Sequence, residues 1–255
     1  MSQLRKKMQK LQRREGPSIG FGAAVREQPR AMVLIALATG SAEAKAALEA
    51  GADAVAIRAE AGSAVAFLES LANAKHTVGV LSEALDEQGA AALAAAGCDF
   101  VISSLEKTES VAVDTERMGH ILIASEGMED NTLRAIAPLG LDGLYVERGP
   151  GGTMVANQLG LVRLATFTST PLLVTVPAKA SVAELRVLRD SGVGGVIASE
   201  NASAKELTAL IKALIAVPAP KKSQRDGGEM AIVPSAAAGH ADHEEEDDEE
   251  DTGSP

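Results

Sequence analysis

Four glutamates, each placed just after a short apolar run, are the first candidates for chemistry in this sequence. They are Glu60, Glu83, Glu126 and Glu147. Paired carboxyl groups can act as general acid and base, and their oxygen atoms suit Mg²⁺ or Mn²⁺. We predict that Glu126 and Glu147 are the catalytic residues and the ligands of any such metal. The alternative is that each glutamate is a solvated loop residue or a charge at the start of a helix.

A glycine-rich segment that begins at Glu147 and ends at Thr153 is the second candidate, with the sequence ERGPGGT. Glycine allows backbone N–H groups to approach an anion, and a following helix adds a favourable field at its N-terminus. An arginine can bind a carboxylate or phosphate through two hydrogen bonds. We predict that a small anionic substrate is bound by Arg58, Arg148, Gly149, Gly151, Gly152 and Thr153. A plain turn with a flexible hinge explains the segment equally well, because a lone glycine-rich loop is a weak motif.

Eight apolar runs and the helices between them must position these residues. The runs are rich in valine and isoleucine, which suits strands buried on both faces. They span 31–38, 54–57, 77–81, 100–102, 121–124, 143–146, 172–176 and 195–198. Helices are predicted over 42–50, 61–72, 83–96, 130–137, 155–167, 182–191 and 204–215, whereas 104–119 predicts a short or distorted helix or none.

Alternating strands and helices with short loops predict a parallel sheet with right-handed crossovers. Eight such units between residues 31 and 216 favour a compact (β/α)8 barrel. An open doubly wound sheet is the alternative, but no G-x-G-x-x-G motif follows the first predicted strand. Active sites of such barrels lie at the C-terminal ends of the strands. The fold class therefore decides which polar residues can belong to a site.

A glycine phrase recurs through the barrel and gives it a two-unit internal repeat. Its four glycines are Gly51, Gly97, Gly140 and Gly192. Each follows a predicted helix, where a left-handed glycine ends the helix at low steric cost. In three copies an aspartate follows two residues later, at Asp53, Asp99 and Asp142. We expect the phrase to turn the chain into the next strand, at the end of the barrel that serves stability.

The same placement removes the histidines and the cysteine from the candidate site. His76, Cys98 and His120 stand just before apolar runs, at the end opposite to the active sites of barrels. Nucleophilic triads built from Ser–His or Cys–His are therefore excluded at the functional end. Lys179 lies beyond the seventh run and is a poor candidate for a Schiff base, which needs a buried amine.

Two phrases, GADAVAI at 51–57 and DSGVGGVIAS at 190–199, resemble even-numbered strands of the aldolase-type and phosphate-binding TIM barrels. The segments ILIASE at 121–126 and GLDGLYV at 140–146, with the following Gly149-Pro150, distantly resemble the metal-dependent pyruvate aldolases. This resemblance implies an aldolase-like lyase in which Glu126 is a metal ligand. The aspartate expected after the Gly-Pro pair is replaced by Gly151-Gly152.

Charge and composition limit the compartment and the classes of partner that we expect for this protein. The chain has 255 residues, a net charge of −11 and one cysteine, which rules out an intramolecular disulfide. No apolar run is long enough to cross a bilayer, and we expect a cytoplasmic protein. The acidic body argues against nucleic acid as a partner of the barrel.

The two ends of the chain differ from the barrel in charge. Residues 1–30 predict a basic arm with a short amphipathic helix that carries Leu4, Met8 and Leu11 on one face. Such a helix could contact an anionic membrane surface, an anionic partner or the acidic tail, dock on its own barrel, or stay solvated. Residues 217–255 predict a linker and a disordered acidic tail, because eight consecutive acidic residues cannot pack.

Two functions remain open from the sequence. The first is a barrel that binds a small carboxylate or phosphorylated metabolite at the C-terminal strand ends, as an aldolase-like enzyme would. The second is a non-catalytic barrel that has kept the scaffold, lost the site and acts through its charged ends. No residue pattern decides the substrate, the reaction or the oligomeric state.

Overall fold

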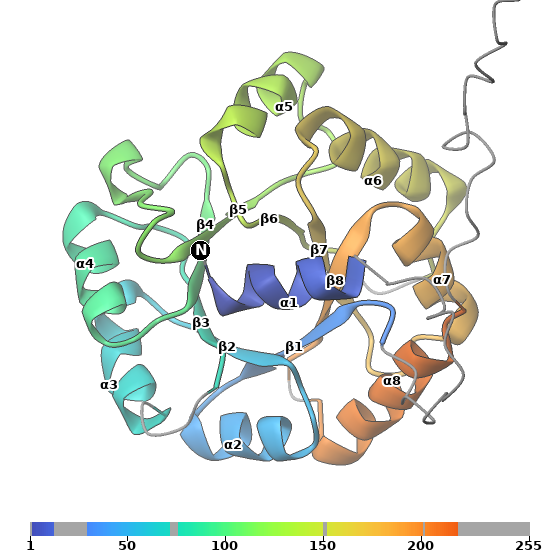
Figure 1. Ribbon diagram of the computed structural model, residues 1–255, viewed down its shortest axis with the longest axis horizontal. Coiled ribbons are helices and arrows are strands. Elements are labelled where there is room, and N and C mark those ends of the chain that lie inside the picture. Colours follow the sequence, from blue (N-terminus) through green and yellow to red (C-terminus); the bar gives the residue numbers. More distant parts are fainter. Residues whose placement is uncertain (1, 13–29, 72–75, 150–151, 201, 219–255) are drawn as a thin grey trace, which may run out of the picture. The chain divides into compact units, whose positions relative to one another are not determined.

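The computed structural model describes residues 2–12, 30–71, 76–149, 152–200 and 202–218 (Figure 1). Eight strands pair in parallel with their neighbours in sequence order, and β1 also pairs with β8. The chain is a (β/α)8 TIM barrel. Its strands are β1 Val33–Ala38, β2 Ala54–Arg58, β3 Val78–Leu81, β4 Phe100–Ser104, β5 Gly119–Ile123, β6 Gly143–Val146, β7 Leu172–Val176 and β8 Val193–Ala198.

Seven helices form the outer ring of the barrel (Figure 1). They are α2 Ser41–Glu49, α3 Ala61–Leu71, α4 Glu87–Ala95, α5 Asp130–Ile136, α6 Val155–Thr168, α7 Val182–Asp190 and α8 Ala204–Ala216. The polar segment after β4 contains only the short 3₁₀ helix η1 Ser110–Ala112, and η2 Ala137–Leu139 follows α5. Helix α4 begins later than predicted, because the Asp86 side chain accepts a hydrogen bond from the Gly89 N–H and caps the helix there.

The repeated glycines end their helices as predicted. Gly51, Gly97, Gly140 and Gly192 have φ angles of 98°, 83°, 68° and 90°. These values lie in the left-handed region, where a side chain would be strained. A capping box between Ser203 and Glu206 begins α8. The Ser181 side chain caps α7, and the Glu184 side chain in the first turn of this helix contacts Arg148, as described below.

The apolar core has two layers separated by the sheet. One layer lies between the strands and the outer helices. The other fills the barrel interior and includes Ile35 of β1, Ile197 of β8 and Phe100 of β4. The register places Ile35 opposite both Ala54 and Ile197, so side chains of neighbouring strands meet at one level. Leu4 and Met8 belong to this interior layer although they precede the barrel in sequence.

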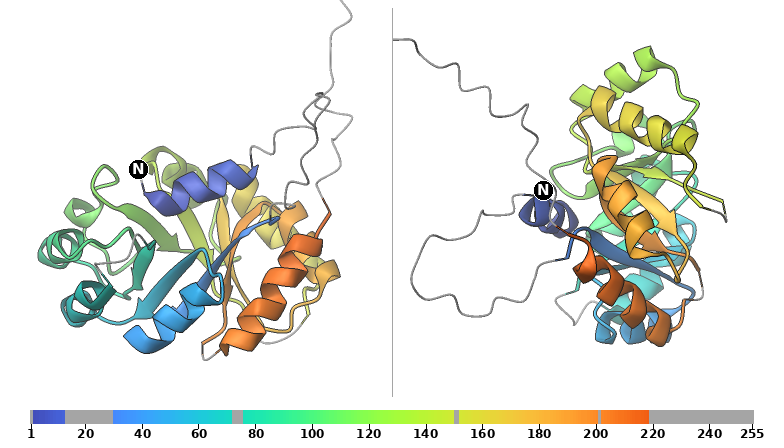
Figure 2. Two further views of the ribbon diagram at one scale, coloured as in Figure 1. Left: turned by 60° about the horizontal axis from the view of Figure 1, so that its bottom comes forward. Right: turned by 90° about the vertical axis from the view of Figure 1, so that its right-hand side faces the viewer.

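These two residues belong to α1, Gln3–Gln12, which lies across the open ring at one end of the barrel (Figures 1 and 2). Leu4 and Met8 are fully buried. This is the N-terminal end of the strands, because α1 is held by residues that immediately precede them. The described part of the basic arm therefore docks on its own barrel, which was one of the interpretations left open by the sequence. The remainder of the arm, 13–29, and the tail from 219 lie outside the described residues.

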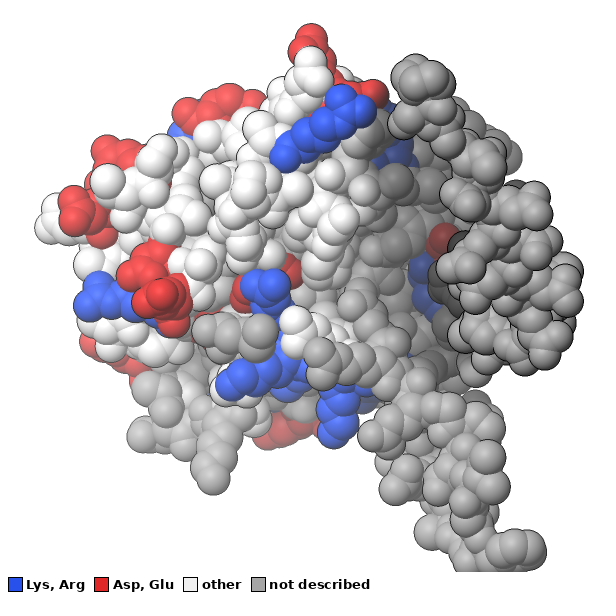
Figure 3. Space-filling model, turned by 45° about the horizontal axis from the view of Figure 1, so that its top comes forward, with Lys and Arg blue, Asp and Glu red and all other residues white. Residues whose placement is uncertain are grey.

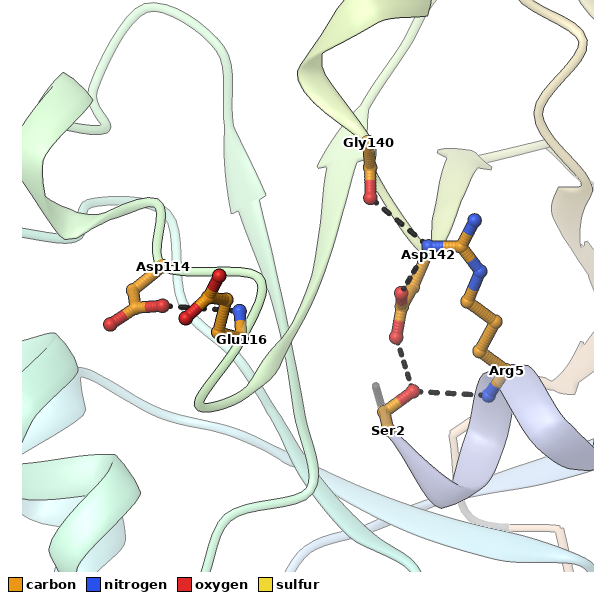
Figure 4. A network of polar contacts seen from close by, with 6 residues as sticks. All are labelled: Ser2, Arg5, Asp114, Glu116, Gly140 and Asp142. Carbon is orange, nitrogen blue, oxygen red and sulfur yellow. Dashed lines mark hydrogen bonds and ion pairs between the residues drawn. The ribbon is translucent and has the colours of Figure 1, made fainter.

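The aspartates of the repeat hold α1 in place. The Asp99 carboxylate accepts hydrogen bonds from the N–H groups of Gln3 and Leu4, at 2.7 and 3.0 Å, and so caps the helix. Asp142 is buried and accepts from the Ser2 hydroxyl and from Arg5, whose Nη1 lies 3.2 Å away (Figure 4).

The third aspartate, Asp53, accepts from the Leu34 N–H and from Arg30 Nη1, both at 2.9 Å. Its backbone oxygen accepts from Lys7 Nζ. The glycines turn the chain as expected, whereas all three aspartates bind the segment that precedes β1. No helix in the described part of the chain is long and apolar enough to span a membrane.

His120 gives this end of the barrel a pH dependence. The ring is buried, and its Nε2 accepts a hydrogen bond from the Asp114 N–H at 3.2 Å. Burial lowers the pKa of His120, although the negative charges of Asp142 and Asp114 act in the opposite direction. Below its ordinary pKa of about 6.5, the unfolded chain then binds more protons than the folded chain. Folding stability is fully present above that value and falls as the pH drops towards the lowered pKa.

We therefore expect wild-type protein to lose stability between pH 7.5 and pH 5.5, and His120→Gln to lose less. Urea unfolding at the two pH values measures the difference. His76→Gln is the matched control, because His76 is exposed. An equal loss of stability in wild type and His120→Gln would show that the prediction is wrong.

Candidate functional site

A pocket of about 540 Å³ opens at the C-terminal ends of β5 and β6. It brings together both predicted catalytic residues, Glu126 and Glu147, with two glycines of the predicted anion-binding loop. The full lining is Ile123, Ala124, Ser125, Glu126, Val146, Glu147, Arg148, Gly149, Gly152 and Asn157. Its place at the ends of the strands is where TIM-barrel enzymes bind their substrates.

Helix α6 fixes the position of Glu126. Asn157 Nδ2 donates to Glu126 Oε2 at 3.0 Å. A Cβ on Gly160 would lie 3.1 Å from Glu126 Cγ, so the glycine allows the glutamate side chain to lie against the helix. Arg163 Nη1 donates to the Glu126 backbone oxygen at 3.0 Å, and its Nε donates to Asp130 at 2.6 Å. One helix thus orients the carboxylate through its amide partner and anchors the loop that carries it.

Glu147 belongs to an ion-pair network across the barrel mouth. Arg58 continues the row of Ala54 and Ala56, which face the barrel interior, and so extends into the mouth. Its Nη2 lies 3.3 Å from Glu147 Oε1, and its Nε donates to Glu200 Oε1 at 2.7 Å. Burial lowers the pKa of Arg58, but the hydrogen bond to Glu200 and the charges of both glutamates outweigh burial and raise it. The arginine therefore carries its charge between two carboxylates.

Tyr145 lies beneath this network, where its hydroxyl group is 2.9 Å from Thr175 Oγ1. Burial raises the pKa of the phenol, and the bond to Thr175 and the charge of Arg58 offset only part of this effect. The hydroxyl stays protonated at neutral pH and can donate a hydrogen bond towards the mouth. This pair was not among the predicted site residues, although Tyr145 is the single tyrosine of the chain and stands next to the last residue of its strand.

Arg148 lines the pocket but is already paired. Its Nη1 lies 3.7 Å from Glu184 Oε1 of α7, and the arginine side chain is 9% exposed. Thr153 donates to the same Glu184 oxygen at 3.4 Å. Both residues therefore connect the loop before α6 to α7. The predicted ligand Gly151 lies outside the described residues, whereas Gly149 and Gly152 are exposed at the pocket.

The other two glutamates do not join the pocket. Glu83 forms an ion pair with Lys107 at 2.7 Å, and this hydrogen bond is the main reason that the pKa of Glu83 is lowered. Glu60 is exposed, and its backbone oxygen accepts from Ser63 and Ala64 at the start of α3. Only Glu126 and Glu147 of the four candidates therefore line one cavity.

The described side chains at the pocket do not form a set of metal ligands. Among the described residues, no group of three or more histidine, cysteine, aspartate or glutamate side chains could hold a metal ion. The Glu126 carboxylate accepts a hydrogen bond from the Asn157 amide, and the Glu147 carboxylate accepts one from the Arg58 guanidinium, so both carboxylates already have partners. These residues do not fit a dedicated Mg²⁺ or Mn²⁺ site, and metal binding by Glu126 and Glu147 stays a prediction from the sequence.

Asn157 and Glu184 are site residues that the sequence reasoning missed. Asn157 stands in the first turn of the helix that follows the glycine-rich loop, a position that could have drawn attention to it. Glu184 lies in the first turn of α7, far in the sequence from the glycine-rich loop that it contacts. Cys98, in contrast, is buried with its thiol pKa raised to about 12, chiefly by burial, which keeps it protonated.

Comparison with known proteins shows the fold and no family. Neither a protein family nor a curated protein matches the sequence. Among solved structures, tryptophan synthase from Mycobacterium tuberculosis aligns with a TM-score of 0.63 and 17% identity, over 85% of this chain and 98% of that chain. Dihydropteroate synthase from Yersinia pestis aligns with a TM-score of 0.50 and 15% identity, over 74% and 95%. At such identities the similarity shows the TIM-barrel fold that this chain shares with these enzymes.

Proposed function

We propose that this barrel binds a small carboxylate or phosphorylated metabolite in the pocket at the ends of β5 and β6. The observation that carries the proposal is that one cavity is lined by Glu126 and Glu147 together with Gly149 and Gly152 of the loop between β6 and α6. A Cβ at Gly149 or Gly152 would meet no atom within 4 Å, so there is room for a ligand beside the loop. The N-cap of α6, Met154, makes no side-chain hydrogen bond, which leaves the first N–H groups of the helix without a side-chain cap.

In this proposal the anionic group binds between the glycine loop and the α6 N-terminus, and the rest of the metabolite extends to the glutamates. Glu126 and Glu147 then serve as acid and base groups. Arg58 does not line the pocket itself, and in this proposal its contact with Glu147 orients that carboxylate towards the metabolite. An aldolase-like reaction is one chemistry that two carboxylates and a bound anion could support.

Gly152→Asp is expected to abolish ligand binding without harming the fold, because it adds a negative charge in open space at the anion site. The assay is thermal unfolding with a panel of small carboxylates and phosphate esters. A ligand at 100 times its Kd should stabilise wild-type protein by about 2.7 kcal/mol. Gly40→Asp is the matched control, since it adds the same charge in open space at the N-cap of α2, outside the pocket.

Binding and chemistry can be separated with isosteric variants. The variants Glu126→Gln and Glu147→Gln should still be stabilised by the ligand against thermal unfolding but should no longer convert it. Glu129→Gln is the control and should keep both properties, because Glu129 is exposed and its side chain makes no cap hydrogen bond. A ligand that stabilises Gly152→Asp as much as wild type would contradict the proposed site.

A non-catalytic scaffold is the second candidate. It is favoured by the internal pairing of both predicted anion-binding arginines, Arg58 with two glutamates and Arg148 with Glu184. The described part of the basic arm contacts its own barrel, which counts against a role of that part in binding an external partner. Absence of stabilisation by any member of the panel would favour this candidate.

A further inference from the structure

Arg148 is a buried cation at the edge of the pocket. Figure 3 shows lysine and arginine side chains, in blue, on the surface of the protein, where water solvates their charge. The Arg148 side chain is only 9% exposed, and it lines the pocket together with Gly149 and Gly152. A guanidinium that is withdrawn from water needs partners for its charge and for its five N–H groups. The contacts of Arg148 therefore decide what this part of the pocket can bind.

Glu184 meets this need only in part. Its Oε1 lies 3.7 Å from Arg148 Nη1, which is within the range of an ion pair but too long for a hydrogen bond. Thr153 donates to the same oxygen at 3.4 Å. In the described part of the chain, no hydrogen bond joins the Arg148 side chain to another residue. The guanidinium can therefore offer its N–H groups to a carboxylate or phosphate in the pocket, which it binds through two hydrogen bonds.

Glu184 has a second possible partner in its own helix. It stands three residues after Ser181, whose side chain caps α7 by accepting from the Glu184 N–H at 3.1 Å. In a capping box, a glutamate at this position accepts from the backbone N–H of the capping residue. This arrangement is complete in α8, where Glu206 Oε2 accepts from the Ser203 N–H at 3.0 Å. In α7 the glutamate side chain extends to Arg148 instead, although the same residue types stand at both positions.

We propose that Glu184 is an internal competitor for the arginine of the pocket. The carboxylate or phosphate group of the ligand binds Arg148 in place of Glu184, and the released glutamate completes the capping box of α7 with the Ser181 N–H. This inference rests on the function proposed above, because it concerns how the same pocket admits its ligand. Binding is weaker than Arg148 alone would allow, since the ligand must first displace a carboxylate.

Removal of the competing charge should strengthen anion binding. Glu184→Gln keeps the size of the side chain and its ability to cap the helix. We expect it to lower the Kd for inorganic phosphate and for acetate about tenfold, the value for an arginine that is otherwise released about a tenth of the time. Titration of each anion at constant ionic strength, followed by thermal unfolding, gives the Kd. A merely structural role of the ion pair predicts weaker binding, because its loss would loosen the loop that lines the pocket.

Glu206→Gln is the matched control. It removes the same charge at the same position of another helix, where the glutamate bonds Ser203 and no arginine, and it should leave both Kd values unchanged. Arg148→Met should raise both Kd values about tenfold or more. Adding Glu184→Gln to Arg148→Met should bring no gain, because no arginine remains to be released. The double variant removes both buried charges and so also serves if Arg148→Met alone fails to fold.

The capping box offers a readout that is independent of affinity. Amide hydrogen exchange of Ser181, followed by nuclear magnetic resonance, should slow when phosphate saturates the protein, because the Ser181 N–H gains the Glu184 carboxylate as an acceptor. The Ser203 N–H already donates to Glu206 and should exchange at an unchanged rate. Equal exchange of Ser181 with and without phosphate would overturn the proposed return of Glu184 to the cap.

The outcomes separate this inference from the function on which it rests. Tighter binding by Glu184→Gln alone, with no gain in the double variant, supports both. If a metabolite stabilises wild type but not Gly152→Asp, while Glu184→Gln binds phosphate and acetate no more tightly than wild type, the competitor is overturned and the function stands. An equal gain in Glu206→Gln would reveal a general effect of charge and would also overturn the competitor. If no anion or metabolite stabilises wild type or Glu184→Gln, both proposals are wrong.

Discussion

Replacing Leu4 with alanine should lower the free energy of unfolding by about 3 kcal/mol, although Leu4 precedes the barrel by almost thirty residues. Its side chain is fully buried in the interior layer, together with Met8 and inward-facing residues of the strands. Truncation removes that packing and leaves a cavity that the closed ring of strands cannot collapse to fill. Chemical denaturation of wild type and variant measures the difference.

Leu139→Ala is the matched control for Leu4. It makes the same chemical change at a side chain that is 49% exposed, and we expect a loss below about 0.5 kcal/mol. Asp142→Asn also tests the contact between α1 and the barrel, because it removes the negative charge that Ser2 and Arg5 contact (Figure 4). If Leu4→Ala costs no more than Leu139→Ala, α1 does not close the barrel in solution.

The second large effect is expected for Phe100→Ala, which should cost about 4 kcal/mol. Phe100 is fully buried and fills the barrel interior beside Gly79 of β3. A Cβ on Gly79 would lie 2.3 Å from the phenyl ring, so the glycine provides the space that the ring occupies. Removal of the ring leaves a cavity on the glycine side that no other side chain fills.

A double-mutant cycle distinguishes this arrangement from a general loss of packing. Gly79→Ala alone should destabilise the protein because it forces the ring to move. In the Phe100→Ala background the same substitution should cost less or should stabilise, since the added methyl group enters the cavity. Denaturant unfolding of the four proteins gives the coupling energy. Additive effects of the two substitutions would show that the two residues do not share one space.

Much of the fold could be predicted from local patterns. Valine- and isoleucine-rich runs, capping residues and left-handed glycines act over a few residues, so they can be read from the sequence directly. The eight strands, most helix bounds and the four glycine stops are confirmed. The polar segment after β4 has no clear apolar period, and in agreement with this it contains only the short 3₁₀ helix η1.

The candidate site was predicted only in part. The rule that polar residues after parallel strands gather at one end agrees with the position of Glu126, Glu147 and the adjacent loop around one pocket, whereas their roles stay a prediction. The rule says nothing about how side chains pair once they are there. Arg58 and Glu200 are 142 positions apart in sequence, and Arg148 reaches Glu184 of the next helix. Such pairings depend on side-chain reach across the closed ring.

The sequence by itself determined where the helices before β2, β4, β6 and β8 end, because a glycine that adopts the left-handed conformation follows each of them. Only the tertiary structure decided what the aspartates of the repeat do. Closure of the barrel brings Asp99, which precedes β4, and Asp142, which precedes β6, to the N-terminal end of the strands, where both bind α1. A contact between residues so far apart leaves no local pattern, since its energy is realised only when β1 pairs with β8.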